Sequence, residues 1–161
     1  MLKELKENDF IVSKTDTKGN ITYVNKIFMD MAGYTEEELL GKPHNIIRHP
    51  DMPKAVFKLL WDMVQNKEEI FAYVLNATKD GGSYWVYANV TPSFDERGKV
   101  IGYYSVRRKP NKDALNVIAP LYKEMLQAEK SGGMNASTKI LTDILNEKGL
   151  DYNELIISLQ K

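Results

Sequence analysis

The chain has 161 residues, and its 22 basic and 22 acidic side chains cancel at neutral pH. This length suits one domain with a helical appendage, and the balanced charge argues against nucleic acid or an anionic membrane surface as a partner. The absence of cysteine excludes disulfides, thiolate metal sites and covalent attachment of haem or flavin. No apolar run approaches the ~20 residues of a membrane span, so we expect a cytoplasmic protein with no direct membrane insertion.

The first half of the sequence predicts two strands followed by short helices. A β-rich hairpin is expected over residues 10–25, because two apolar stretches flank a turn sequence that contains Gly19 and Asn20. A short helix should follow and end at Gly33, and Thr35 with a glutamate three positions later should begin one further turn. A longer amphipathic helix is expected after Asp51.

The second half predicts three hairpin-linked strands and then more helix. Strand-like runs occupy residues 70–78, 83–91 and 100–108, separated by glycine-containing turns. The last fifty residues carry helical stripes, interrupted at residues 131–133, whose apolar side chains we expect to pack within the chain rather than against a partner.

Together these elements predict an α+β fold. Five antiparallel strands should form one sheet with helices gathered over one face, where the sheet can enclose a ligand, and with further helices at the C-terminus. We expect an N-terminal cap over residues 1–9, a core domain over residues 10–110 and a helical extension over residues 111–161.

Two sequence motifs support this fold and add a function. Residues 17–25 and 33–43 resemble the opening half of PAS domains, and His44-Asn45-Ile46-Ile47-Arg48-His49-Pro50-Asp51-Met52-Pro53 resembles the signature of PAS domains of the bacterial aerotaxis-receptor type. The likeness extends over roughly residues 10–125. One departure is Ile70-Phe71, where that family usually has a tryptophan that would shield a flavin.

The resemblance implies a sensor rather than an enzyme. Members of this group bind FAD noncovalently, and a free-standing PAS protein of this kind serves split energy-taxis systems. The expected partner is therefore a membrane-bound chemoreceptor-type transducer, which would recruit the protein to the membrane and read its redox, energy or oxygen state. Whether the chain also forms a homodimer stays open.

The motif around Arg48 supplies candidates for a phosphate site. Arg48 can make bidentate contacts to a phosphate, and His49 can add a second hydrogen bond. Asp51 belongs to the same string of residues that matches the family's cofactor-binding segment. A structural alternative is that Arg48 pairs with Asp51 while Asp51 caps the following helix.

Four further residues are candidates for contacts to a flavin ring. The amide of Asn76 shares a strand face with apolar residues and matches the ring's donor and acceptor atoms, and Asn89 is a second such amide. Asn25 belongs to the site by resemblance, although it also suits a helix cap. Trp61 can stack on a ligand or pack in the core. His44 is interpreted as structural.

Two other functions remain open at this point. A haem b sensor would use His44 or His49 as the axial ligand, and a cofactor-free adaptor would use the sheet to bind another protein. An enzyme is disfavoured, because the sequence shows no nucleophile with an adjacent base and no glycine-rich phosphate loop.

Overall fold

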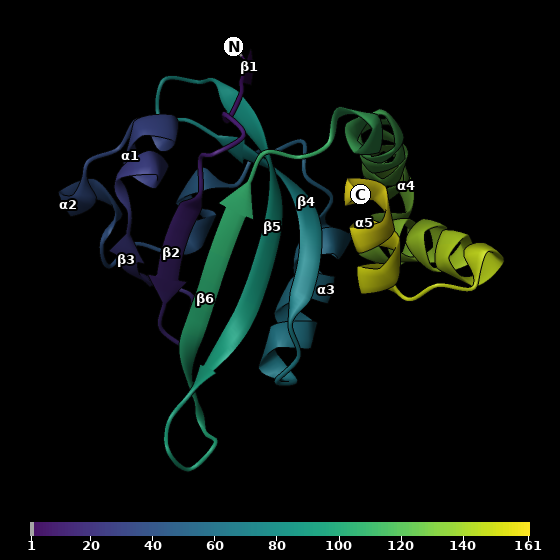
Figure 1. The fold of residues 1–161 in the computed structure, drawn as a ribbon. Coiled ribbons are helices and arrows are strands. Elements are labelled where there is room, and N and C mark those ends of the chain that lie inside the picture. Colours follow the sequence, from purple (N-terminus) through teal and green to yellow (C-terminus); the bar gives the residue numbers. More distant parts are fainter. Residues whose placement is uncertain (1) are drawn as a thin grey trace.

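The computed structural model describes residues 2–161 and shows a central sheet between two groups of helices (Figure 1). The strand order is β1-β5-β6-β2-β3, and β4 also pairs with β5. The five predicted antiparallel strands are confirmed, and a short sixth strand, β1, pairs in parallel with β5, so the sheet is mixed. The strands are β1 (Leu2–Lys3), β2 (Ile11–Thr15), β3 (Ile21–Val24), β4 (Ile70–Ala77), β5 (Ser83–Phe94) and β6 (Val100–Arg108).

The first two α-helices begin and end at the residues that the sequence pattern indicates. Asn25 caps the first helix by accepting from the backbone N–H of Phe28, and Gly33 ends it with φ of 80°, a conformation that glycine adopts without strain. Thr35 and Glu38 form the predicted capping box. The helical segments are α1 (Lys26–Ala32), α2 (Glu36–Leu39), the 3-10 helix η1 (His44–Ile47), α3 (Lys54–Gln65), α4 (Lys112–Lys148) and α5 (Tyr152–Gln160).

The predicted break in the C-terminal helices is a kink. Gly133 has φ of 70° and ψ of −165° inside α4, which redirects the second half of that helix. Glu129, just before the kink, accepts hydrogen bonds from the backbone N–H groups of Lys54 and Ala55 at 3.0 and 3.2 Å. The C-terminal extension therefore caps the first turn of α3.

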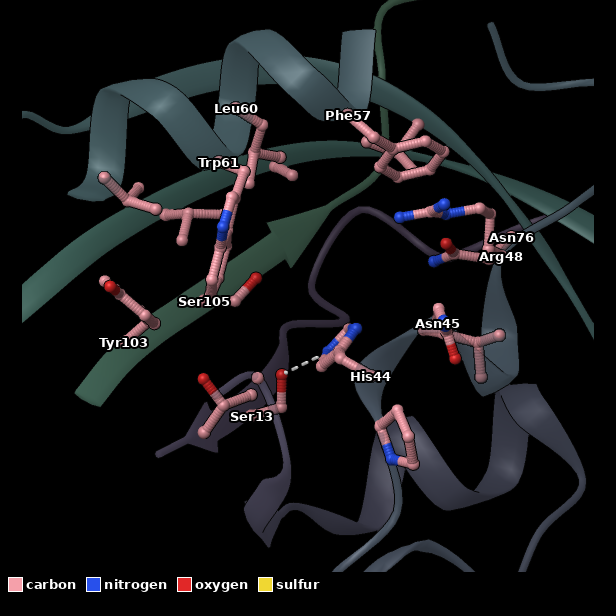
Figure 2. Close-up of a pocket in the computed structure, with 18 of the residues that line it drawn as sticks. Ser13, His44, Asn45, Arg48, Phe57, Leu60, Trp61, Asn76, Tyr103 and Ser105 are labelled. Carbon is pink, nitrogen blue, oxygen red and sulfur yellow. Dashed lines mark hydrogen bonds between the residues drawn. The ribbon is translucent and has the colours of Figure 1, made fainter. Parts of the chain in front are cut away.

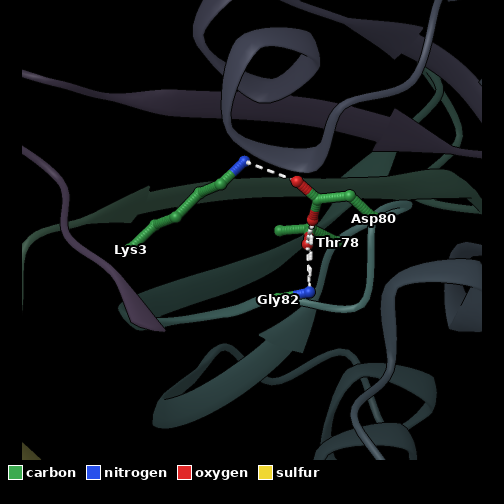
Figure 3. Close-up of polar contacts among 4 residues, drawn as sticks. All are labelled: Lys3, Thr78, Asp80 and Gly82. Atoms are coloured by element: carbon green, nitrogen blue, oxygen red, sulfur yellow. Dashed lines mark hydrogen bonds and ion pairs between the residues drawn. The ribbon is translucent and has the colours of Figure 1, made fainter. Parts of the chain in front are cut away.

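A polar turn lies beside the N-terminal strand (Figure 3). Between β4 and β5, the Thr78 hydroxyl donates to the Asp80 carboxylate, and the Gly82 N–H donates to the Thr78 hydroxyl at 2.8 Å. The other carboxylate oxygen of Asp80 lies 3.9 Å from the ammonium nitrogen of Lys3. The turn thus fixes the β4–β5 hairpin, while β1 is held mainly by its backbone pairing with β5, to which the solvent-accessible Lys3–Asp80 pair adds little.

Alternate side chains of β4 point to opposite faces of the sheet. Val74 and Asn76 face the side covered by α3, which we call the inner face. Tyr73 points to the outer face, where α4 and α5 pack: its backbone oxygen accepts from the Tyr122 hydroxyl at 2.7 Å, and its own hydroxyl donates to Gln160 at 3.1 Å. The C-terminal apolar stripes pack within the chain, as predicted.

The helices of residues 2–161 include none with the length and apolarity that crossing a membrane requires.

Candidate functional site

A cavity of about 300 Å³ lies between the inner face of the sheet, α3 and η1 (Figure 2). Its walls are mainly apolar. Helix α3 and the sheet contribute Phe57, Leu60, Trp61, Val64, Val74, Ala88, Val90 and Tyr103. Most of the polar side chains gather on the sheet floor and along η1, and two more come from the end of β2 and the turn after it: Ser13, His44, Asn45, Arg48, Asn76, Ser105 and Arg107, with Thr15 and Lys18. An apolar slot with a few convergent polar groups is typical of a small-molecule site.

The charged side chains of the cavity all have the same sign. Lys18, Arg48 and Arg107 contribute to its lining, and none of the described residues that line it is an aspartate or glutamate. A ligand that offers hydrogen-bond acceptors or negative charge would therefore be favoured over a cation.

Arg107 is the most deeply buried of these cations. Its side chain is 3% exposed, one terminal nitrogen donates to the Ser13 hydroxyl at 2.8 Å, and its guanidinium carbon lies 4.7 Å from the centre of the Phe28 ring. Its Nε has no partner within the described chain. Burial lowers the pKa of Arg107 to about 10, so the group stays charged at neutral pH.

Ser13 links Arg107 to His44. The Ser13 oxygen lies 3.0 Å from His44 Nε2. Because that oxygen accepts from Arg107, its own hydrogen can be donated to Nε2, which requires an imidazole unprotonated at that nitrogen. Burial and the charges of Arg107 and Arg48 lower the pKa of His44 to about 3, so the ring is neutral. His44, interpreted from the sequence as structural, thus lines the cavity.

Asn76 carries an unpaired donor at the same cavity. Its side chain is 3% exposed, and its Nδ2 has no hydrogen-bond partner in residues 2–161. The predicted position is confirmed, since Asn76 shares the inner face of β4 with Val74. A buried amide left unpaired costs about 1–3 kcal/mol, and a ligand acceptor would remove that cost.

Arg48 lies at the exposed rim. Its guanidinium carbon stacks 3.7 Å from the centre of the Phe57 ring, which orients the charged group while its solvent-exposed position leaves it accessible (Figure 2). Over the described residues Arg48 forms no ion pair with Asp51. Asp51 does not cap α3 either: the N-cap position belongs to Pro53, and the carboxylate of Glu129 serves the first turn instead.

Of the other predicted site residues, only Trp61 lines the cavity, where its ring packs edge-on against Tyr103 with 5.4 Å between centroids. His49 lies outside the lining and accepts from the Asp51 N–H at 3.0 Å. Asn25 is occupied by its helix cap and by bonds to the backbone of Val12 and Phe10.

Asn89 also lies away from the cavity. The alternation along β5 directs Ala88 and Val90 to the inner face and Asn89 to the outer face, where its amide donates to the backbone oxygen of Ile70 at 3.3 Å. The sequence pattern placed Asn89 on the same strand face as Trp85 and Tyr87, but it did not show that this face points away from the cavity.

The same reasoning overlooked Ser13 and Arg107. The two-residue period of the strand places Arg107 on the same face as Tyr103 and Ser105, but the sequence does not show that this face lines a cavity.

Comparison with known proteins defines the family. The profile described as the PAS fold matches residues 21–107, more than half of the chain. The chain belongs to the PAS family.

Its relatives are sensory and regulatory proteins. The chain is 40% identical to the aerotaxis receptor of Escherichia coli over 121 residues, which is 75% of this chain and 24% of the receptor. It is 27% identical over 97 residues to the nitrogen fixation regulatory protein of Klebsiella pneumoniae, which is 60% of this chain and 20% of that protein. The chain thus spans a quarter or less of these relatives.

Solved structures agree on the fold. The light-state structure of the LOV domain of the blue-light photoreceptor Aureochrome1 superimposes with a TM-score of 0.61 at 20% identity, over 71% of this chain and 90% of that one. A structure titled "Flavin Analogue Sheds Light on Light-Oxygen-Voltage Domain Mechanism" has a TM-score of 0.58 at 25% identity, over 71% of this chain and 86% of that one.

Proposed function

We propose that this PAS domain binds FAD noncovalently in the cavity and reports redox or energy state, including oxygen, to a membrane-bound transducer. The observation that carries the proposal is a pair of buried, unpaired donors, Asn76 Nδ2 and Arg107 Nε, at an apolar cavity. A flavin ring is flat and apolar on its faces and carries carbonyl and ring-nitrogen acceptors along its edge. The donors and the slot fit such a ring.

The size of the cavity limits which part of FAD it can enclose. A volume of about 300 Å³ is at the lower end of the range for ligand sites, so it suits the ring rather than a whole dinucleotide. The ribityl chain and diphosphate would then extend to the rim. There the guanidinium of Arg48, oriented by Phe57, provides a permanent charge for the phosphates.

The cavity has an apolar wall even though the chain has Ile70-Phe71 where the family usually has a tryptophan. Ile70 is fully buried in the core, and Phe71 stacks on Tyr87 on the outer face. Trp61 and Phe57 of α3 instead supply aromatic surface beside the cavity. We infer that these two rings shield the flavin from solvent.

The alternatives receive less support from the geometry. A haem would need a free histidine nitrogen, whereas His44 Nε2 is engaged by Ser13 and His49 lies outside the lining. An adaptor that binds partners through the outer face of β4 would first have to displace α5, whose residue Asn153 accepts from the Phe71 N–H at 2.9 Å.

The test is the flavin content of the purified protein. Heat-released extract should contain FAD on chromatography, and the intact protein should show a flavin spectrum with bands near ~370 and ~450 nm, which the cofactor's own electronics set. An extract without flavin, together with unchanged fluorescence and melting temperature in excess FAD, would refute the proposal. A Soret band near ~400 nm would indicate haem instead.

Signalling requires a second protein, and β4 provides a physical route to it. Asn76 faces the cavity, while Tyr73 on the same strand is hydrogen-bonded to α4 and α5. A change in flavin hydrogen bonding at Asn76 would therefore shift a strand to which the C-terminal helices are attached. The partner, by likeness to the aerotaxis receptor, is a chemoreceptor-type transducer.

A pull-down from native membranes with oxidised and dithionite-reduced protein tests this output. We expect the transducer to be recovered preferentially with one redox state. Equal recovery with both states would contradict the redox switch and leave flavin binding intact.

A further inference from the structure

Three strands contribute buried donors without partners; two of these, on Asn76 and Arg107, line the cavity, whereas Tyr84 lies outside its lining. Asn76 Nδ2 comes from β4, Tyr84 Oη from β5 and Arg107 Nε from β6, and none has a hydrogen-bond partner in the described structure. Burial raises the pKa of Tyr84, and the charge of Arg107 and the neighbouring side chain of Asn76 partly offset the rise, so the three groups belong to one cluster.

The buried positive charge of Arg107 is only weakly compensated by neighbouring groups of the protein. Its observed partners are the neutral Ser13 hydroxyl and the face of the Phe28 ring, and its Nε remains free. Burying a charge without a counter-charge is costly, and a side chain kept in that position implies a compensating group from elsewhere. Because the cavity opens at this position, the ligand can supply that group.

We propose that Arg107 is the charge partner of the reduced flavin ring, so that the cavity floor binds the anionic reduced form more tightly than the oxidised form. Uptake of two electrons and one proton, the proton at N5, leaves one negative charge spread over N1 and the C2 carbonyl of the ring. This inference rests on the proposed binding of flavin and adds a residue that determines which redox state is favoured.

Because Arg107 is deeply buried, its expected contact is to the flavin ring rather than to the phosphates. Arg107 is 3% exposed, whereas Arg48 lies exposed at the rim. A diphosphate carries two charges, and burying them against a single guanidinium would leave one of them uncompensated. At the rim, the phosphates can contact both Arg48 and water. The single guanidinium of Arg107 at the floor suits one delocalised negative charge on the ring.

The experiment compares Arg107→Met, Arg107→Lys and Arg108→Met proteins by dithionite titration against a reference dye. Arg108 is the matched control, because it is the next residue on β6 and stacks on Tyr87, on the outer face. Arg107→Met should weaken binding of the reduced form at least ~10-fold more than binding of oxidised FAD, which is a fall in midpoint potential of about 30 mV for a two-electron couple. Arg107→Lys and Arg108→Met should stay close to wild type.

Repeating the titration with riboflavin distinguishes the two sources of negative charge. An equal fall with riboflavin and FAD supports a contact to the ring, while a fall seen only with FAD assigns Arg107 to the diphosphate and overturns the inference. An Arg107→Met potential equal to wild type also overturns it and leaves flavin binding intact. A wild-type protein that binds no flavin refutes both proposals. If Arg107→Met does not fold, Arg107→Gln removes the charge while keeping a donor, and the same fall is expected.

Discussion

Asparagine side chains on the two faces of the sheet have different hydrogen-bond environments. Asn76 on the inner face has an unpaired, buried amide nitrogen, whereas Asn89 on the outer face donates to Ile70 and lies 3.4 Å from a carboxylate oxygen of Glu69. The outer face also pairs Tyr73 and Tyr122 with neighbouring groups, although the Tyr152 hydroxyl there has no partner in the described residues.

This difference indicates two separate roles for one sheet. At β4 the outer face is covered by the C-terminal helices, so the aromatic side chains there contribute mainly to stability (Figure 1). The inner face keeps a cavity and unpaired donors, which reduce the stability of the ligand-free protein and prepare it for binding. Substitutions on the two faces should therefore have different effects.

The largest expected effect is on stability and comes from the outer face. Tyr73→Ala should lower the free energy of unfolding by about 3–5 kcal/mol, because it removes a fully buried ring between the sheet and α5. Tyr73→Phe keeps the ring and should cost only about 1 kcal/mol. Urea unfolding measures both values. A Tyr73→Ala protein as stable as wild type would show that the outer face is not a stabilising interface.

A smaller effect should appear on the inner face as pH falls. The folded-state pKa of His44 is lowered to about 3 from 6.5, so the folded state binds fewer protons than the unfolded state. The resulting stability is fully present above pH 6.5 and is lost as the pH falls from there toward 3. The loss is at most about 1.4 kcal/mol per pH unit.

The matched variant for this pH effect is His44→Gln, which cannot gain that proton. Urea unfolding at pH 7 and pH 5 should show a larger loss for wild type than for His44→Gln. Equal losses would mean that His44 is protonated in the folded protein and that the Ser13 hydroxyl does not donate to it.

Much of the fold followed from local signals in the sequence. The capping box at Thr35, the glycine that ends α1 and the three hairpin-linked strands depend on neighbouring residues, and each appears where expected. The N-terminal strand β1 was not predicted, because two residues carry no periodic pattern and the pairing with β5 joins positions far apart in the chain.

The site was harder to predict than the fold. Asn76 was placed correctly by strand alternation, but four other predicted site residues lie outside the cavity lining: Asn25, His49, Asp51 and Asn89. Arg107 was overlooked because a charged residue near the end of a strand usually faces solvent. Only the packing of β6 against β2 shows that its guanidinium points inward to Ser13.

The most direct test of the division between the two faces is the FAD affinity of Asn76→Ala compared with that of Asn89→Ala. Both variants lose an asparagine amide from adjacent strands, so they differ mainly in the face affected. Fluorescence titration should show Asn76→Ala binding FAD about 10-fold more weakly than wild type, since a lost hydrogen bond of about 1.4 kcal/mol is a factor of ten. Asn89→Ala should bind as wild type does. Equal weakening in both variants, or weakening in Asn89→Ala alone, would contradict an inner-face flavin site.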